Sequence, residues 1–250
     1  MKWYDGDVIL TDIEKVNDNT RKFFIKLIDI DDEECDKLEF IPGQFVELIL
    51  PIHNDIKKCS RHYSIASLPK NTTLEFIINK VNGGEGTEYL FSDTVIPNNT
   101  KWQMVAPLGQ FILPKSLNKN TYFICTGTGI APFKSMIFDL FYNKKELVID
   151  KNIIVIFGCR EKKDILYYEE FKLLKEINYN FEYNIALSRE KTDDYTFGYV
   201  QDVIDTLYKN TNFNNSDFFI CGTSNMVVDV KNNLLNKNIK LENIYLEIYV

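Results

Sequence analysis

Histidine and cysteine are scarce in this chain, and their scarcity limits the metal chemistry it can perform. Only two histidines, His53 and His62, occur in 250 residues, too few for a histidine-rich metal site. The five cysteines are scattered over positions 35, 59, 125, 159 and 221. No two of them have the spacing of zinc ligands or of an iron–sulfur cluster. An odd number of scattered cysteines is typical of a reducing compartment, so we expect a cytoplasmic chain without a metal or cluster of its own.

Long apolar runs are also missing from the sequence. No stretch is long enough to cross a bilayer, and the N-terminal residues 1–12 lack the apolar core and cleavage site of a signal peptide. The formal net charge is −7, so we do not expect a nucleic-acid partner. The 45% hydrophobic and 26% charged composition is that of a globular protein, and the length allows one large domain or two modest ones.

The first part of the chain has the pattern of short strands separated by turns. Its apolar segments are rich in β-branched and aromatic residues, which favour strands. The predicted strands cover residues 7–16, 21–28, 44–50, 62–68, 73–81 and 102–113, with one short helix at 87–93. Six such strands without long helices predict an antiparallel β-barrel or sandwich.

The pattern changes after the polar segment 114–120, which we interpret as a linker. Apolar strands then alternate with amphipathic helices, which predicts a parallel sheet with helices on both faces. The predicted strands are 121–126, 152–158, 181–188, 217–222 and 243–250, and the predicted helices are 133–142, 167–177, 199–209 and 225–237. We therefore expect two domains, a β-barrel over residues 1–115 and an α/β domain over residues 120–250.

Two motifs in the first part are suited to a ligand with an anionic end and a flat end. In the segment CSRHYSIASLP, residues 59–69, Arg61 and Tyr63 share one face because side chains alternate along a strand. An ordinary edge strand with a surface arginine has the same pattern. In GGEGTEYLF, Gly84, Gly86 and Thr87 precede a helical stretch, which makes this segment a second candidate anion site.

In the second part, polar or glycine-containing turns follow four of the predicted parallel strands. Ligands bind at the carboxyl ends of such strands, so these turns are candidate binding loops. The turns are 127–132 (GTGIAP), 158–161 (GCRE), 188–190 (SRE) and 221–223 (CGT). A serine and an arginine together can bind a phosphate monoester through charge-assisted hydrogen bonds. Each turn by itself is also compatible with a solvated loop, and a cysteine at a strand end with a core residue.

In their order along nearly the whole chain, these motifs resemble the ferredoxin–NADP reductase superfamily, in which a flavin-binding β-barrel precedes a nicotinamide-binding α/β domain. RHYS is similar to its flavin motif. The resemblance implies that Arg61 binds the FAD pyrophosphate, Tyr63 stacks on the isoalloxazine and Ser64 lies near flavin N5. GEGT is similar to the second flavin motif, which implies that Thr87 contacts the pyrophosphate. The other residues expected at the flavin are His62, Asn79, Lys80, Gly84 and Gly86.

The same resemblance implies a dinucleotide site in the second part. GTGIAP is similar to the pyrophosphate loop, and CGTSNM to the motif that places a cysteine, here Cys221, beside nicotinamide C4. LSRE and GYVQ resemble the pocket for the adenine and the NADP 2′-phosphate. The residues expected at this cofactor are Thr126, Gly127, Thr128, Gly129, Pro132, Arg160, Ser188, Arg189, Tyr199, Gln201, Cys221, Gly222 and Met226.

The C-terminal EIYV resembles the ending glutamate-x-tyrosine of the plant-type members. The resemblance implies that Tyr249 shields the flavin face that nicotinamide reaches and that Glu247 assists proton or electron transfer. This chain departs from that ending by the additional Val250. Together with Ser64 and Cys221, these residues form the expected catalytic set.

The resemblance implies an FAD-dependent enzyme that passes electrons between NADPH and a separate one-electron carrier protein, ferredoxin or flavodoxin. Hydride would pass between nicotinamide C4 and flavin N5. The acceptor is expected to be another molecule, because the chain has no cluster cysteines. Ser188 and Arg189 favour NADPH, whereas Glu190 leaves NADH open, since an acid can bind the ribose hydroxyls.

Three other interpretations remain at this point. The chain could be the reductase component of a multicomponent oxygenase, which has every motif above and differs in its partner. A free flavin reductase is similar around YSIAS but tends to lack the motif that binds the adenylate, so GEGT argues against it. A non-catalytic electron-transfer subunit of a larger dehydrogenase complex often carries an added cysteine cluster, which is absent here.

Overall fold

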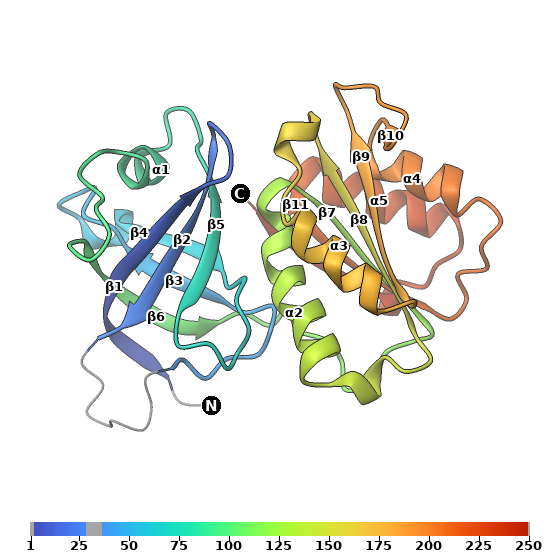
Figure 1. Ribbon diagram of the computed structural model, residues 1–250, viewed down its shortest axis with the longest axis horizontal. Coiled ribbons are helices and arrows are strands. Elements are labelled where there is room, and N and C mark those ends of the chain that lie inside the picture. Colours follow the sequence, from blue (N-terminus) through green and yellow to red (C-terminus); the bar gives the residue numbers. More distant parts are fainter. Residues whose placement is uncertain (1–2, 29–36, 250) are drawn as a thin grey trace. The chain divides into compact units, whose positions relative to one another are not determined.

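The computed structural model describes residues 3–28 and 37–249, so Cys35 and Val250 lie outside the described residues. The chain forms two compact units (Figure 1). Unit 1 comprises Met1–Ile112 and Ala131–Asp139, and unit 2 comprises Leu113–Ile130 and Leu140–Val250. Because one helical segment of the second half belongs to unit 1, the domain boundaries at residues 115 and 120 stay a prediction.

Unit 1 is built on a six-stranded sheet in which all neighbouring strands are antiparallel. The end strands of the order β4-β3-β6-β1-β2-β5 also contact each other, so the sheet curls toward a barrel as predicted. The strands are β1 (Tyr4–Lys15), β2 (Thr20–Leu27), β3 (Phe45–Ile49), β4 (Ser60–Ser64), β5 (Leu74–Asn79) and β6 (Lys101–Leu108). A short helix, α1 (Glu85–Leu90), lies between β5 and β6 in the chain.

The core of unit 1 follows from the alternation of side chains along these strands. Val8 and Leu10 of β1 are fully buried, and residues two apart on β2, β3 and β6 join them in one cluster. The cluster includes Phe23, Ile25, Val46, Leu48, Trp102 and Met104. The residues between these positions are partly or fully exposed, so one sheet face supplies the core.

Two predicted strands of unit 1 end earlier than the sequence pattern indicated. The segment predicted at 62–68 leaves the ladder after Ser64, because the N–H of Ile65 donates to Gln44 and that of Ala66 donates to Glu75. The strand predicted at 102–113 ends at Leu108, since Gly109 adopts a left-handed φ of 94°. These corners turn the chain, and periodicity alone does not reveal them.

Unit 2 contains a six-stranded sheet of order β10-β9-β8-β7-β11-β12, in which every pairing is parallel. Its strands are β7 (Asn120–Thr126), β8 (Asn152–Cys159), β9 (Phe181–Leu187), β10 (Thr196–Phe197), β11 (Ser216–Thr223) and β12 (Ile244–Tyr249). The α-helices that follow strands are α2 (Ala131–Tyr142), α3 (Tyr168–Ile177), α4 (Val200–Leu207) and α5 (Ser224–Asn236). The predicted alternation is confirmed, except that the two-residue strand β10 was not anticipated.

Aromatic side chains fill both faces of this sheet. Helices α4 and α5 cover one face of the sheet (Figure 1). On that face, Tyr122 stacks on Phe218 with a centroid distance of 5.0 Å. On the other face, Phe171 of α3 lies 5.0 Å from the ring of Tyr183. Phe219 stacks on Tyr245 on the strand β12. Burial on both faces explains why the strands are almost continuously apolar.

The remaining helical segments are short. The 3-10 turns are η1 (Ile56–Lys58), η2 (Gly127–Ile130), η3 (Lys145–Leu147), η4 (Lys162–Asp164) and η5 (Leu241–Asn243). Within residues 3–28 and 37–249, no helix is long and apolar enough to cross a membrane. The cytoplasmic location stays a prediction.

We expect Phe218→Ala to lower the free energy of unfolding by about 3–5 kcal/mol, because it leaves a cavity among Tyr122, Phe213 and the sheet. Urea denaturation, with one probe for each unit, measures this loss. Phe197→Ala removes a ring that is 55% exposed and serves as the control, with a change within about 0.5 kcal/mol. Similar losses in the two variants would contradict this account of the core.

Candidate functional site

Arg61 is held on strand β4 of unit 1 by two backbone carbonyls. Its Nη1 donates to the carbonyl oxygens of Lys58 at 2.9 Å and Ser60 at 2.7 Å. Its Nη2 lies 4.0 Å from a carboxylate oxygen of Glu85, the first residue of α1. The guanidinium is therefore fixed in place before any ligand arrives, with one nitrogen directed toward the start of the helix.

The two predicted flavin motifs meet at this point. A Cβ added to Gly86 would lie 2.7 Å from Nε of Arg61, so the glycine lets the Arg61 side chain in this position pass close to the helix. The hydroxyl of Thr87 accepts from the N–H of Val81 at 3.0 Å and lies 3.1 Å from the carbonyl oxygen of Gly84. Thr87 thus shapes the loop before α1, a role that the sequence did not indicate.

Tyr63 and Ser64 follow Arg61 on the same strand, where the sequence placed them. Tyr63 is half-buried and packs against the core of unit 1, and this burial raises the pKa of its phenol despite the nearby Arg61 charge. Ser64 is buried, whereas His62 is exposed and its ring lies 5.1 Å from that of Phe45. Arg61 and Tyr63 lie opposite Leu48 and Val46 of β3, so the two side chains share one face of the sheet.

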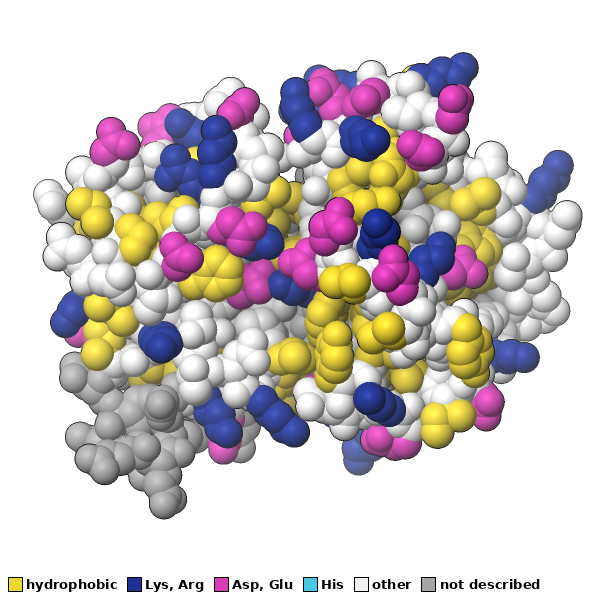
Figure 2. All heavy atoms as spheres, in the orientation of Figure 1, with side chains coloured by type: hydrophobic (Ala, Val, Ile, Leu, Met, Phe, Trp, Pro, Cys, Tyr) yellow, Lys and Arg dark blue, Asp and Glu magenta, His cyan; other side chains and the backbone are white. Residues whose placement is uncertain are grey.

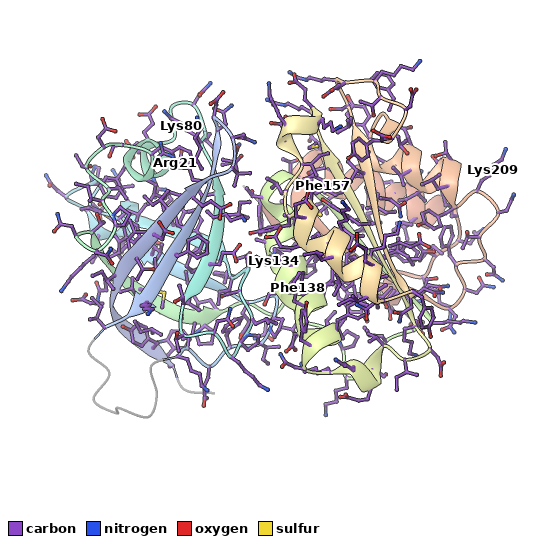
Figure 3. The ribbon with its side chains drawn as sticks, viewed as in Figure 1. Arg21, Lys80, Lys134, Phe138, Phe157 and Lys209 are labelled. Atoms are coloured by element: carbon purple, nitrogen blue, oxygen red, sulfur yellow. The ribbon has the colours of Figure 1, made fainter. Side chains whose placement is uncertain are left out.

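Asn79 and Lys80 lie at the end of strand β5, next to the turn before β2. The amide oxygen of Asn79 accepts from the Thr20 hydroxyl at 3.1 Å, and the N–H of Lys80 donates to Asn19 at 2.7 Å. Figure 3 labels Lys80 and Arg21 at this end of unit 1, and Figure 2 shows Lys and Arg side chains gathered there. The Lys80 side chain is exposed.

These residues fit an FAD molecule in its expected place. A fixed guanidinium beside a glycine at the start of a helix suits a pyrophosphate, and a half-buried tyrosine two residues on suits an aromatic ring. A surface pocket of about 400 Å³ elsewhere on unit 1 is lined by Trp102, Cys59 and Lys101 and includes none of the predicted site residues. Arg61 and Tyr63, rather than the residues of that pocket, therefore stay the predicted flavin site.

In unit 2, the loop after β7 packs directly on the end of β11. A Cβ on Gly129 would lie 2.4 Å from the carbonyl oxygen of Cys221. A Cβ on Gly222 would meet Cε of Met226 at 2.5 Å and Oγ1 of Thr126 at 2.7 Å. Glycine at these positions is required by the close approach of two loops, and the structure brings all five residues together.

The remaining residues of this loop differ in exposure. Gly127 has a left-handed φ of 52° and no atom within 4 Å of its added Cβ, so its outer side is open to a ligand. Thr128 is partly exposed, and Pro132 is buried in the first turn of α2, where a missing N–H costs nothing.

Parallel pairing of β11 and β12 brings the predicted catalytic residues of unit 2 together. Cys221 is in register with Glu247, and its Sγ lies 3.8 Å from Oε2 of that residue. Burial, followed by the Glu247 charge, raises the pKa of the Cys221 thiol, while a hydrogen bond with Tyr249 opposes the shift. The thiol is therefore protonated at neutral pH and does not carry a negative charge at this strand end.

The ends of β8 and β9 bring two arginines side by side. The N–H of Ser188 donates to Cys159 at 3.0 Å, and that of Arg189 donates to Arg160 at 2.9 Å. Lys163, by hydrogen bond and charge, followed by Arg189 and Arg160, lowers the pKa of the Glu161 carboxyl. Three cationic side chains therefore act on the Glu161 carboxylate at this edge of the sheet.

Glu190 has a structural partner that the sequence did not suggest. Its carboxylate accepts from the backbone N–H of Lys162 at 2.6 Å, which joins the loop after β9 to the turn η4. The bond orients the carboxylate toward η4. A backbone donor leaves no signature in residue types, so sequence patterns could not have identified this contact.

Tyr199 and Gln201 begin helix α4 near the same sheet edge. Tyr199 is 67% exposed, and its N–H donates to Asp202 at 2.6 Å. The amide oxygen of Gln201 is buried and has no hydrogen-bond partner among the described residues. An unsatisfied buried acceptor costs free energy unless a ligand supplies a donor, so this group fits a nucleotide in its expected place.

Comparisons with known proteins identify the same two domains. The sequence matches the family described as "Oxidoreductase FAD-binding domain" over residues 7–112 and the "Oxidoreductase NAD-binding domain" over residues 123–232. A solved ferredoxin NADP+ reductase from Neisseria gonorrhoeae with bound FAD and NADP has the same fold, with a TM-score of 0.81 at 19% identity over 99% of each chain.

Three curated relatives are named for different electron partners. Ferredoxin--NADP reductase B of Sorangium cellulosum is 31% identical, over 75% of this chain and 76% of its own length. One component of the Na(+)-translocating NADH-quinone reductase of Idiomarina loihiensis is 26% identical, over 93% of this chain and 65% of its own length. The toluate 1,2-dioxygenase electron transfer component of Pseudomonas putida is 25% identical, over 95% of this chain and 66% of its own length. The chain thus spans less than two thirds of the last two relatives.

Buried thiols make the stability of unit 2 depend on pH. Burial raises the pKa of Cys125 and Cys221, and raises that of Cys159 to about 12, from an ordinary value of 9.0. Below pH 9 these thiols are protonated in both states, and above it the unfolded chain releases protons that the folded chain keeps. We expect the free energy of unfolding to fall by about 0.8 kcal/mol per thiol between pH 8 and 9.5.

Urea midpoints at the two pH values measure this fall. The Cys221→Ala variant should lose less stability over the same interval, because one buried thiol is gone. An equal fall in both proteins would show that this thiol titrates normally in the folded state.

Proposed function

The chain belongs to the ferredoxin–NADP reductase superfamily, and from this membership we propose that it passes electrons between NADPH and a separate carrier protein, ferredoxin or flavodoxin. Membership makes it an oxidoreductase with an FAD-binding and a nicotinamide-binding domain. The finer assignment rests on one observation above the others, the pairing of Ser188 and Arg189 with the end of β8, which sets Arg189 beside Arg160.

The proposed roles of the residues follow from their positions. A bound flavin supplies the chemistry, since it exchanges hydride with nicotinamide and single electrons with a carrier. Arg61 binds the pyrophosphate of FAD, Tyr63 supports its ring and Ser64 lies at its reactive edge. The loop Gly127–Ile130 binds the dinucleotide pyrophosphate, because its glycines permit close backbone approach.

At the end of β11, the neutral Cys221 thiol offers a small, uncharged surface to the nicotinamide. Burial beside the Glu247 carboxylate raises the pKa of this thiol, so the thiol adds no second negative charge at this strand end. Glu247 holds its carboxylate beside this thiol, and Tyr249 follows on the same strand.

The charges at the ends of β8 and β9 support NADPH as the nucleotide. Two adjacent arginines and a serine match the charge of a 2′-phosphate, which NADH lacks. Glu190, the group that could bind the ribose hydroxyls of NADH, is held toward η4 by the bond from the Lys162 N–H to its Oε2. Both observations favour the phosphorylated nucleotide.

The carrier is proposed from chemistry and from the relatives. The cradle formed by Arg61 and Gly86 suits a resident FAD, which argues against a free flavin reductase. The first relative is named for ferredoxin, whereas another is the electron-transfer component of an oxygenase. An oxygenase component is therefore the second candidate function, and it uses the same two sites with a different acceptor.

An anaerobic visible spectrum of the purified protein tests the proposal. A flavin spectrum that NADPH bleaches faster than NADH supports both the resident FAD and the nucleotide. Subsequent reduction of ferredoxin or flavodoxin, compared with an oxygenase component, separates the two candidate functions. A colourless protein that does not take up added FAD would overturn the flavin assignment.

We expect Arg189→Ala to weaken NADPH binding by about 1–3 kcal/mol, because it removes a charged hydrogen bond to the 2′-phosphate. Binding of NADH should change little. Titration calorimetry with both nucleotides measures the difference, and Lys209→Ala, an exposed charge beyond α4, serves as the matched control. Equal weakening for NADPH and NADH would contradict the assignment.

A further inference from the structure

A buried ion pair joins helix α2 to strand β5 within unit 1. Nζ of Lys134 lies 2.6 and 2.8 Å from the two carboxylate oxygens of Glu75. The two side chains are only 12% and 11% exposed. By contrast, the pair Lys15–Asp18 in the same unit is 65% and 89% exposed at a similar distance. Figure 3 labels Lys134 on α2.

Neutral hydrogen bonds surround this pair. The hydroxyl of Ser135 donates to the carbonyl oxygen of Ser67 at 2.7 Å, and both groups are buried. The Ser67 hydroxyl in turn accepts from the N–H of Glu75 at 3.2 Å, and the Ala66 N–H donates to the Glu75 carbonyl at 2.9 Å. The helix, the strand and the segment after β4 therefore share one polar cluster.

Apolar contacts flank the cluster along the first turns of α2. The rings of Phe133 and Phe111 lie 5.9 Å apart. Cε of Met136 comes so near to Gly43 that an added Cβ would lie 2.4 Å from it. Charged, neutral and apolar contacts thus fix the same stretch of helix against unit 1.

A buried ion pair is a costly way to stabilise a helix. Desolvation of the two charges offsets most of their attraction, so a pair of apolar side chains could give equal stability. What the pair adds is a single register, because any shift of α2 leaves a buried charge without its partner. The Lys134–Glu75 pair is therefore better suited to fix the position of α2 than to stabilise the fold.

The elements that the pair joins are those that lead into the two cofactor motifs. Helix α2 begins at Ala131, directly after the Gly127–Ile130 loop. Ser67 follows Ser64 by three residues, and Glu75 lies on the strand that ends at Asn79. Each motif is thus within a few residues of the polar cluster.

We propose that Lys134 and Glu75 are a positioning pair, which sets the helix that follows the dinucleotide loop against the strand and segment that follow the flavin motif. The inference rests on the proposed function, because it assigns the pair to hydride exchange. A misplacement of about 1 Å between reacting groups costs about 10²-fold in rate, so loss of the register affects the rate more than binding.

Four variants test the pair: Glu75→Gln, Lys134→Met, their combination and a control, Lys15→Met. The control removes the lysine of the exposed Lys15–Asp18 ion pair. FAD and NADP+ dissociation constants are measured by titration, and flavin reduction by NADPH is followed in a stopped-flow instrument. Each single variant should slow reduction about 10²-fold and change the two dissociation constants less than about threefold. Lys15→Met should behave as the native protein.

The combined variant and Lys134→Arg separate positioning from stability. The combined variant carries no buried charge and should fold even where a single variant does not, yet it should remain slow. Lys134→Arg keeps a donor for both carboxylate oxygens and should restore most of the rate. Rates within about threefold of the native protein in the combined variant would overturn the proposal, as would losses confined to the dissociation constants.

Amide hydrogen exchange keeps this test distinct from that of the proposed function. If neither nucleotide reduces the native flavin, the proposed function fails. The pair is then judged by exchange at residues 131–142, which should quicken in the single variants and stay unchanged in Lys15→Met. Unchanged exchange in the single variants would overturn the positioning role.

Discussion

Backbone hydrogen bonding at the ends of the strands is the constraint on which both candidate sites depend. In unit 1, the segment after Ser64 leaves β3 and bonds to Gln44 and Glu75, and this corner ends the strand that carries Arg61. In unit 2, Ser188 and Arg189 continue the pairing of β9 with the end of β8. Because buried N–H and carbonyl groups need partners, these bonds determine where each strand ends and therefore where its functional side chains lie.

Charge is distributed in this protein according to local partners rather than to the net value. The chain is acidic overall, yet Arg160 and Arg189 lie at one sheet edge, and the acidic residues next to them are engaged by Lys163 and by the Lys162 backbone. Two arginines are therefore neighbours at this edge although the net charge of the protein is negative. The proposed preference for NADPH thus depends on a few local groups, not on composition.

Two kinds of buried ionisable group serve opposite purposes. The Cys221 thiol is desolvated beside the Glu247 carboxylate, so its pKa is raised and it stays neutral. Lys134 and Glu75 are desolvated together, so they remain paired and specify one arrangement of α2. In this way burial keeps a thiol neutral at the end of β11, and it keeps two opposite charges paired between α2 and β5.

Sequence alone determined the fold class, the order of barrel and parallel sheet, and the motifs at Arg61, Gly127–Ile130, Ser188 and Cys221, because hydrophobic period and loop residues are local properties. Tertiary structure decided the rest. A glutamate among the apolar residues of β5 and a lysine in the apolar first turns of α2 were visible signals, but only folding made them partners. Strand ends and the role of Glu190 depend on backbone groups from distant segments, which residue types do not encode.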